Sequence, residues 1–221
     1  ALLLDMQLSP RRGPDSPAIT ESEWADIRFG LEAGVDWMAV PAGRDGDAVR
    51  QLRQFFAEQK RTNIGILARV KNPSALVALD PNIQEADGII LGGLDPASEG
   101  SGAEISRIVQ QCLSTRKLVV MAAGLNSDVT STLSASPDAW LLSAETSLGP
   151  NPLRSVQTLD GLIRQEEAND LGEPQAEVAL TTEQDKAVAA AVRQANEMQA
   201  EAIAVLTRAG NSATLCAALR P

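Results

Sequence analysis

The chain has 221 residues, of which 44% are hydrophobic, and its formal net charge is -10. This composition supports a packed core, and the negative charge argues against nucleic acid and anionic membranes as direct partners. The chain contains no His, which excludes Ser-His catalysis and His-ligated metal sites. Its apolar runs are all shorter than the ~20 residues of a membrane-spanning helix, so we expect a soluble protein without membrane insertion.

Short apolar runs alternate with helical patterns through the first 165 residues. Buried strands are predicted at residues 2–5, 37–40, 64–70, 88–91, 118–121 and 139–142. The first helix is predicted to begin at a capping box, because Thr20 is followed three residues later by Glu23. Such alternation is typical of a parallel α/β sheet with right-handed crossovers. Two architectures fit it: an open doubly wound sheet, or part of an eight-stranded (β/α) barrel.

The pattern changes after residue 165. Residues 166–181 are polar and are predicted to form a linker between domains 1–165 and 182–221. Beyond the linker, we expect a helix at 182–200, a strand at 202–206 and a second helix at 213–219. This αβα unit is too small to hold a core on its own.

The chain has two Cys, Cys112 and Cys216, both on apolar helical faces. We expect buried thiols there rather than a disulfide or a metal site. The chain begins with Ala1 and no initiator Met, which suggests processing or residues that precede it.

Two cations mark the end of the predicted strand at residues 64–70. Arg69 and Lys71 are two residues apart, so in a strand both side chains leave the same face. Active sites of α/β folds lie at the carboxyl ends of parallel strands. This strand end is therefore the first candidate functional site.

Three motifs, in this order along the chain, resemble the pyruvate kinase family. Residues 19–30 (I-T-E-S-E-W-A-D-I-R-F-G) resemble a helix start in that family's barrel. Residues 138–149 (D-A-W-L-L-S-A-E-T-S-L-G) resemble its D-x-x-M-L-S-G-E-T-A-x-G run, and residues 202–212 resemble a strand and loop of its C-terminal domain. The resemblance covers nearly the whole chain. It implies a partial or complete TIM-type barrel of the pyruvate kinase kind, with a small αβα C-terminal unit.

The resemblance also implies phosphoryl transfer between phosphoenolpyruvate and ADP, yet the catalytic positions differ. The family's K-I-E pattern reads Arg69-Val70-Lys71 here. Arg for Lys keeps the charge but not the shape, and Lys71 stands where the family has a metal-binding Glu. An ammonium there would repel a divalent cation. Ala123 replaces the Thr of the family's A-T-Q-M-L motif.

Two acids correspond to metal ligands of the family. Asp95 stands where an A-R-G-D motif has its metal-binding Asp, and Asp5 aligns with an acid that helps to hold potassium, although Met6 replaces the neighbouring Thr. Arg69, Lys71 and Asp95 allow two interpretations: a remnant anion pocket for a phosphate or carboxylate, or an internal salt bridge. No cofactor is expected, and Mg²⁺ and K⁺ are implied only for an active kinase.

Two other segments resemble family sites. The turn with Thr207, Arg208, Gly210 and Ser212 resembles a loop that holds an effector's phosphate, although Ser212 as a helix N-cap explains it equally well. We interpret Glu145 and Thr146 as structural, a strand-end carboxylate and a helix cap.

The barrel predicted by the resemblance is incomplete. Two of its strands are missing, and residues 9–17 stand in place of a separate small domain. Such a barrel would leave two sheet edges open to pairing, so either the protein has more chain than this sequence or something else covers those edges. We therefore predict a catalytically inactive, pyruvate-kinase-like structural or interaction subunit whose open barrel edges are covered by other protein subunits. The alternative is a metabolite-binding or weakly active pyruvate kinase. A plastid, mitochondrial or cytoplasmic location stays open.

Overall fold

The computed structural model describes residues 3–5, 18–42, 46–70, 79–92, 101–123, 137–142, 146, 148–169 and 178–219. The chain divides into two compact units. The first comprises residues 1–95, 117–123 and 137–143, and the second comprises residues 96–116, 124–136 and 144–221. The predicted domain boundaries at residues 165 and 182 remain predictions.

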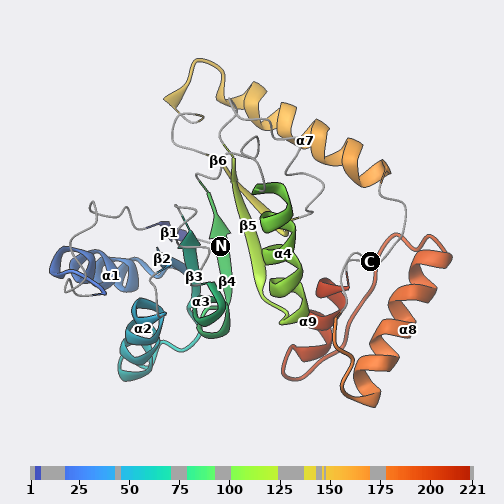
Figure 1. Ribbon diagram of the computed structural model, residues 1–221, viewed down its shortest axis with the longest axis horizontal. Coiled ribbons are helices and arrows are strands. Elements are labelled where there is room, and N and C mark those ends of the chain that lie inside the picture. Colours follow the sequence, from blue (N-terminus) through green and yellow to red (C-terminus); the bar gives the residue numbers. More distant parts are fainter. Residues whose placement is uncertain are drawn as a thin grey trace. The chain divides into compact units, whose positions relative to one another are not determined.

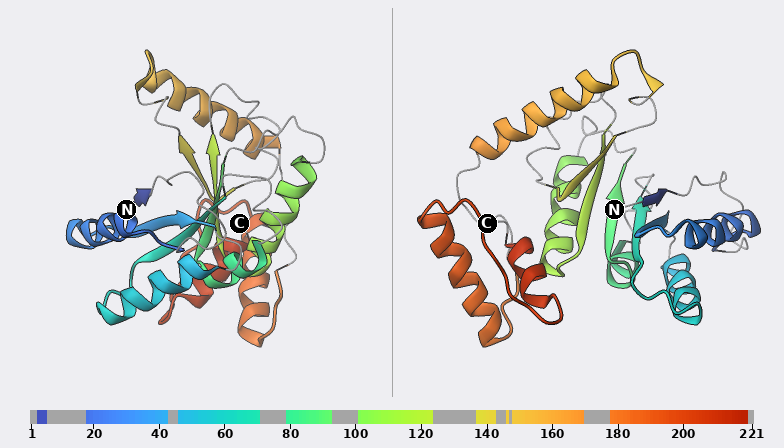
Figure 2. Two further views of the ribbon diagram at one scale, coloured as in Figure 1. Left: turned by 60° about the vertical axis from the view of Figure 1, so that its left-hand side comes forward. Right: turned by 180° about the vertical axis from the view of Figure 1, so that it is seen from behind.

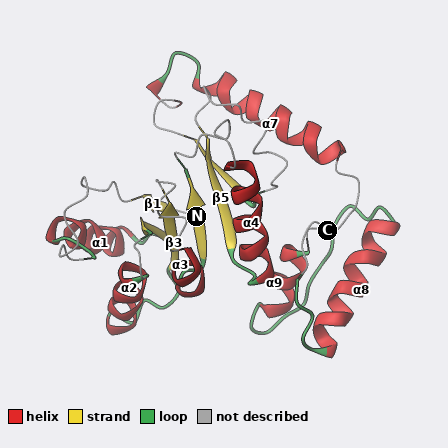
Figure 3. Ribbon diagram, viewed as in Figure 1, coloured by secondary structure: helices red, strands yellow, loops and turns green. Residues whose placement is uncertain are grey.

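Six parallel strands form one sheet in the first unit (Figures 1 and 3). They are β1 (Leu3–Asp5), β2 (Trp37–Pro41), β3 (Gly65–Val70), β4 (Gly88–Leu91), β5 (Leu118–Ala123) and β6 (Ala139–Leu142). Each strand pairs with its neighbour in sequence, in the order β1-β2-β3-β4-β5-β6. A doubly wound sheet would reverse its strand order at a switch point. The sequential order decides between the two predicted architectures, and the sheet is part of a TIM-type barrel.

Among the described residues of the first unit, three helices accompany this sheet: α1 (Glu21–Ala33), α2 (Asp47–Glu58) and α3 (Leu79–Glu85). The capping box predicted for α1 is confirmed, since the Thr20 hydroxyl accepts from the Glu23 N–H and the Glu23 carboxylate accepts from the Thr20 N–H. α1 lies close against β1 and β2, because a Cβ on Gly30 would come within 2.7 Å of Leu4 and 2.9 Å of Met38. Both views of Figure 2 show the strands side by side.

The two faces of the sheet are covered to different extents. Side chains alternate between faces along each strand. On the face toward α1 and α2, the residues of β2 to β5 are almost fully buried: Met38, Val40, Ile66, Ala68, Val70, Ile89, Leu91, Val119 and Met121. We call the opposite side the inner face. Its buried centre is Ala39, Leu67 and Ile90, and around it lie partly buried residues: Leu3, Trp37, Val120, Ala122 and Leu141.

The described residues of the second unit form four helices: α4 (Ser101–Ser114), α7 (Pro152–Asn169), α8 (Glu183–Glu197) and α9 (Asn211–Ala218). α8 begins at a capping box of Thr182 and Asp185. It packs beside α9, where Val178, Leu215 and Ala218 form a small buried cluster. α7 continues four residues into the predicted linker, because residues 165–168 (Q-E-E-A) are good helix formers.

One ion pair within the second unit joins the end of α4 to the start of α8. Arg116 Nη2 lies 3.1 Å from Asp185 Oδ2, and the same oxygen accepts hydrogen bonds from Thr181 and Thr182. Desolvation acts to raise the pKa of Asp185. The hydrogen bonds from Thr181, Arg116 and Thr182 outweigh desolvation and hold this pKa below its ordinary value.

Two further predictions have clear outcomes. Residues 202–206 form neither a helix nor a strand and, within the described chain, pair with no other strand, which corrects the strand prediction. The apolar pattern is typical of a strand, yet a ladder needs a partner, and Leu206 is fully exposed. Cys112 and Cys216 are buried thiols, as predicted, and burial raises the pKa of the Cys216 thiol.

Among the described helices, none combines the length and the apolar character needed to cross a membrane.

Gly65 is expected to be essential for packing on the inner face. A Cβ at this position would lie 2.2 Å from the Trp37 ring, so Gly65→Ala should lower the free energy of unfolding by about 1–3 kcal/mol. The control is Gly161→Ala in α7, where a Cβ meets nothing within 4 Å. It should be neutral or stabilise by up to about 1 kcal/mol. Urea denaturation measures both, and a Gly65→Ala protein as stable as the wild type would contradict this packing.

Candidate functional site

Arg69 lies near the carboxyl end of β3, as the sequence predicts. Its register partners are Pro41 of β2 and Ile90 of β4, and its carbonyl accepts a hydrogen bond of 2.8 Å from the Ala42 N–H. It shares the inner face with Leu67, because residues two apart in a strand point to the same side. A cationic side chain therefore lies on the inner face of the sheet, beside the apolar residues Pro41 and Ile90.

The environment of Arg69 is partly dehydrated. The residue is half-buried, and burial lowers the pKa of its guanidinium. Arg nevertheless stays protonated at neutral pH, because its ordinary pKa is so high. A half-buried positive charge of this kind is stabilised by an anionic or hydrogen-bonding partner.

The other predicted residues of this site are only partly described. Lys71, Asp95 and Glu145 lie outside the described residues, so the two interpretations of the Arg69 site stay open. Ala123 ends β5, in register with Leu142 of β6. Thr146 is buried.

The predicted phosphate turn has its hydroxyls engaged within the second unit. Thr207 Oγ1 accepts a hydrogen bond of 3.1 Å from the Gly210 N–H, and the buried Ser212 hydroxyl accepts one of 2.8 Å from Gln184 Nε2. Gly210, with φ of 83°, is the N-cap of α9, so the interpretation of Ser212 as the N-cap is wrong. Arg208 is exposed. Phosphate binding at this turn stays a prediction.

The opposite, amino end of the sheet holds polar contacts that the sequence analysis missed. Asp87 Oδ2 accepts hydrogen bonds from the Ile66 N–H at 2.8 Å and from Arg53 Nη2 at 3.1 Å. Asp138 Oδ2 accepts one of 2.7 Å from the Val119 N–H. Each acid lies directly before one strand. Its carboxylate accepts a hydrogen bond from a backbone N–H near the start of the strand that comes earlier in the sequence. The sequence signal that could have revealed these contacts is an Asp directly before β2, β4 and β6, at residues 36, 87 and 138.

Two cations complete this amino end at the last turn of α3. Arg53 donates to the Glu85 carbonyl at 2.8 Å, and Lys117 donates to the Ala86 carbonyl at 2.7 Å. Carbonyls at a helix end have no partner within the helix, and cations are favourable there. The amino end of the sheet is thus held by specific polar contacts, and in (β/α) barrels this end serves stability.

Comparison with known proteins gives the family. Residues 9–156 match the family described as pyruvate kinase, barrel domain. The chain belongs to the pyruvate kinase family. This assignment agrees with the sequential strand order and with the resemblance of residues 19–30 and 138–149.

Individual relatives match over almost the whole chain at low identity. Pyruvate kinase isozyme A, chloroplastic, of Nicotiana tabacum is 25% identical over 98% of this chain and 41% of its own length. The pyruvate kinase of Lactococcus lactis is 28% identical over 93% of this chain and 45% of its own length. That of Agaricus bisporus is 29% identical over 96% and 44%. The chain therefore spans less than half the length of these relatives.

The pyruvate kinase family implies a divalent metal ion and potassium, and the described residues do not fit a divalent ion. At the level of Arg69, the inner face carries Pro41, Ile90 and Val120, none of which has a side-chain oxygen. A hard dication prefers oxygen ligands, and the Arg69 charge repels it. Groups of three or more His, Cys, Asp or Glu able to hold a metal are absent from the part of the chain that the structure describes.

Asp87 offers a direct test of the amino-end contacts. Asp87→Ala leaves the Ile66 N–H and the Arg53 guanidinium without their shared acceptor, so the free energy of unfolding should fall by about 1–3 kcal/mol. Asp87→Asn keeps one carbonyl acceptor and should lose less. Urea denaturation of the two variants distinguishes them. Equal stability of Asp87→Ala and the wild type would show that these contacts contribute nothing.

Proposed function

We propose that this chain is a catalytically inactive member of the pyruvate kinase family that serves as a structural or interaction subunit of a larger assembly. The observation that carries the loss of catalysis is Arg69. It supplies a half-buried guanidinium at the family's K-I-E position, and its described register partners, Pro41 and Ile90, carry no carboxylate. Phosphoryl transfer depends on positioned metal ions and charges, so a site whose described register partners lack oxygen ligands is poorly suited to it.

The contrast between the two ends of the sheet supports the same reading. At the amino end, Asp87, Asp138, Arg53 and Lys117 keep specific hydrogen bonds. At the carboxyl end, Asp5 ends β1, whereas Pro41, Leu91 and Leu142 end their strands without a catalytic group. This pattern suits a chain that keeps the fold of the family without its chemistry.

The edges and the inner face of the sheet support a role in assembly. Within the described residues, β1 and β6 each pair with one strand only, so each presents an open edge. β6 is also poorly covered, since Ala139 is exposed and its other residues are half-buried. Open parallel edges invite pairing with another chain. Other protein subunits that cover these edges would complete the barrel.

Helix α7 adds apolar surface that suits a partner. Leu153 and Val156 are 70% and 48% exposed and lie three residues apart, on one side of the helix. Leu148, just before the helix, is 85% exposed. Clustered large apolar side chains at a surface are typical of interaction sites.

The loss of catalysis predicts that the purified protein forms no ATP from phosphoenolpyruvate and ADP above background, with Mg²⁺ and K⁺ present. The Lactococcus lactis relative, assayed in parallel, is the positive control. Phosphoenolpyruvate-dependent ATP formation that disappears in Arg69→Ala would contradict the proposal, because it would place an active site in this chain rather than in a contaminant.

A second candidate function, binding of a phosphorylated acid, is favoured by the charge and partial burial of Arg69. A ligand present at 100 times its Kd should stabilise the protein by about 2.7 kcal/mol. We therefore expect millimolar phosphoenolpyruvate to raise the melting temperature of the wild type and not that of Arg69→Ala. The absence of any shift in the wild type would count against this candidate.

A further inference from the structure

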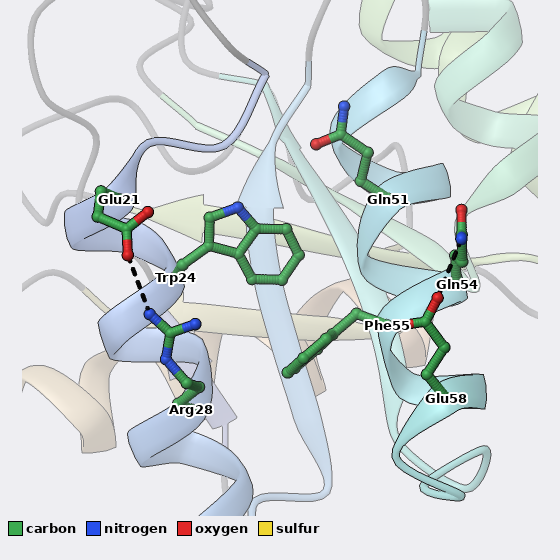
Figure 4. A pocket seen from close by; sticks show the side chains of 7 residues that line it. All are labelled: Glu21, Trp24, Arg28, Gln51, Gln54, Phe55 and Glu58. Atoms are coloured by element: carbon green, nitrogen blue, oxygen red, sulfur yellow. Dashed lines mark hydrogen bonds and ion pairs between the residues drawn. The ribbon is translucent and has the colours of Figure 1, made fainter.

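An open groove of about 450 Å³ lies between α1 and α2 in the first unit (Figure 4). α1 contributes Glu21, Trp24 and Arg28, and α2 contributes Phe55 and Glu58. These helices lie on the side of the sheet opposite the inner face, so the groove is separate from the Arg69 site. Its volume lies within the usual range of ligand-binding pockets.

Two aromatic rings form the centre of the groove. The ring centroids of Trp24 and Phe55 are 5.0 Å apart with an interplanar angle of 69°, a T-shaped pair. In this geometry the edge of one ring meets the face of the other, so other ring faces stay accessible. Both residues are half-buried, and Figure 4 shows both rings between the two helices. Within the described chain, the indole N–H of Trp24 has no hydrogen-bond acceptor.

The charged side chains that line the groove favour binding of a cation. Glu21 is neutralised by Arg28, whose Nη2 lies 3.3 Å from Glu21 Oε1. Glu58 is exposed and receives a hydrogen bond of 3.0 Å from Gln54 Nε2, which is a neutral donor. The negative charge of Glu58 is therefore uncompensated by the groove's own residues, and Glu58 follows Phe55 by three residues on α2.

We infer that this groove binds an arginine-bearing segment of a partner protein. A guanidinium can stack on an aromatic face while it donates a forked pair of hydrogen bonds to a carboxylate such as Glu58. A backbone carbonyl of the same segment can accept from the Trp24 indole. Arginine suits this combination better than lysine, since an ammonium is a point charge that neither stacks nor forks.

The charge of the whole chain agrees with a basic partner. Its formal net charge of -10 attracts cationic segments and speeds their association. The inference goes beyond the proposed loss of catalysis, because a groove on the outer helices could bind a partner in an active or an inactive enzyme alike.

The test is titration of the full chain, labelled with ¹⁵N, with an acetylated and amidated tetra-arginine peptide. NMR shifts of the Trp24 indole N–H and of the α1 and α2 backbone report binding. The matched ligand is a tetra-citrulline peptide, which has nearly the same shape without the charge. We expect saturable shifts at the groove with tetra-arginine and none with tetra-citrulline.

Variants distinguish binding at the groove from non-specific electrostatic attraction of the cationic peptide to the negatively charged chain. Trp24→Leu and Glu58→Gln should each weaken binding by about five- to tenfold. Asp26→Asn removes the same charge from an exposed position of α1 outside the groove and should change the affinity by less than about twofold. Glu58→Gln is an exposed substitution and keeps the test decisive if Trp24→Leu fails to fold.

Three results would overturn the inference. They are shifts that miss the groove, equal binding of the citrulline peptide, or equal losses in Asp26→Asn and Glu58→Gln. The kinase assay above uses other reagents and another site, so its result does not affect this one.

Discussion

A parallel strand has two edges whose hydrogen-bonding groups need partners and two faces whose apolar side chains need cover. The rest of this structure depends on how that requirement is met. The strands β2 to β5 have neighbours on both sides, and their helix-facing residues are buried. The strands β1 and β6 have one described neighbour each, and Trp37, Val120 and Leu141 on the inner face are only partly buried. What covers these surfaces is the central question about this protein.

The membership in the pyruvate kinase family gives this question its context. A (β/α) barrel closes on itself and so removes its edges, with its interior filled by side chains from all strands. The described strands stop short of closure. The close contact between Gly65 and Trp37 shows that the inner face is nevertheless packed to a specific shape at its centre. Partner subunits that complete the barrel would explain both the specific packing at the centre of the inner face and the unpaired edges of β1 and β6.

Much of this architecture could be predicted from the sequence. Apolar runs located all six strands, because buried parallel strands are short and bounded by polar or turn residues. The capping box at Thr20 marked the start of α1 correctly. The choice between an open sheet and a barrel needed the structure, since strand order depends on pairing between distant segments.

The misses have physical reasons. The hydrogen bonds from Ile66 and Arg53 to Asp87 span 21 and 34 residues, so local patterns could not reveal them. Residues 202–206 have the composition of a strand, but a strand is defined by its neighbour. The sequence located Arg69 at a strand end, and the structure added its half-buried setting on the inner face. The groove of Trp24 and Phe55 could not be predicted from the sequence, because its two rings come from different helices.

The native mass of the particle that contains this chain, measured together with the mass of the chain itself, tests the central claim most directly. Native mass spectrometry of the protein isolated from its source gives both values. The account predicts a heteromeric particle in which this chain is one subunit among different proteins. A homotetramer of one chain that forms ATP from phosphoenolpyruvate would contradict it, and would show an ordinary kinase assembly instead.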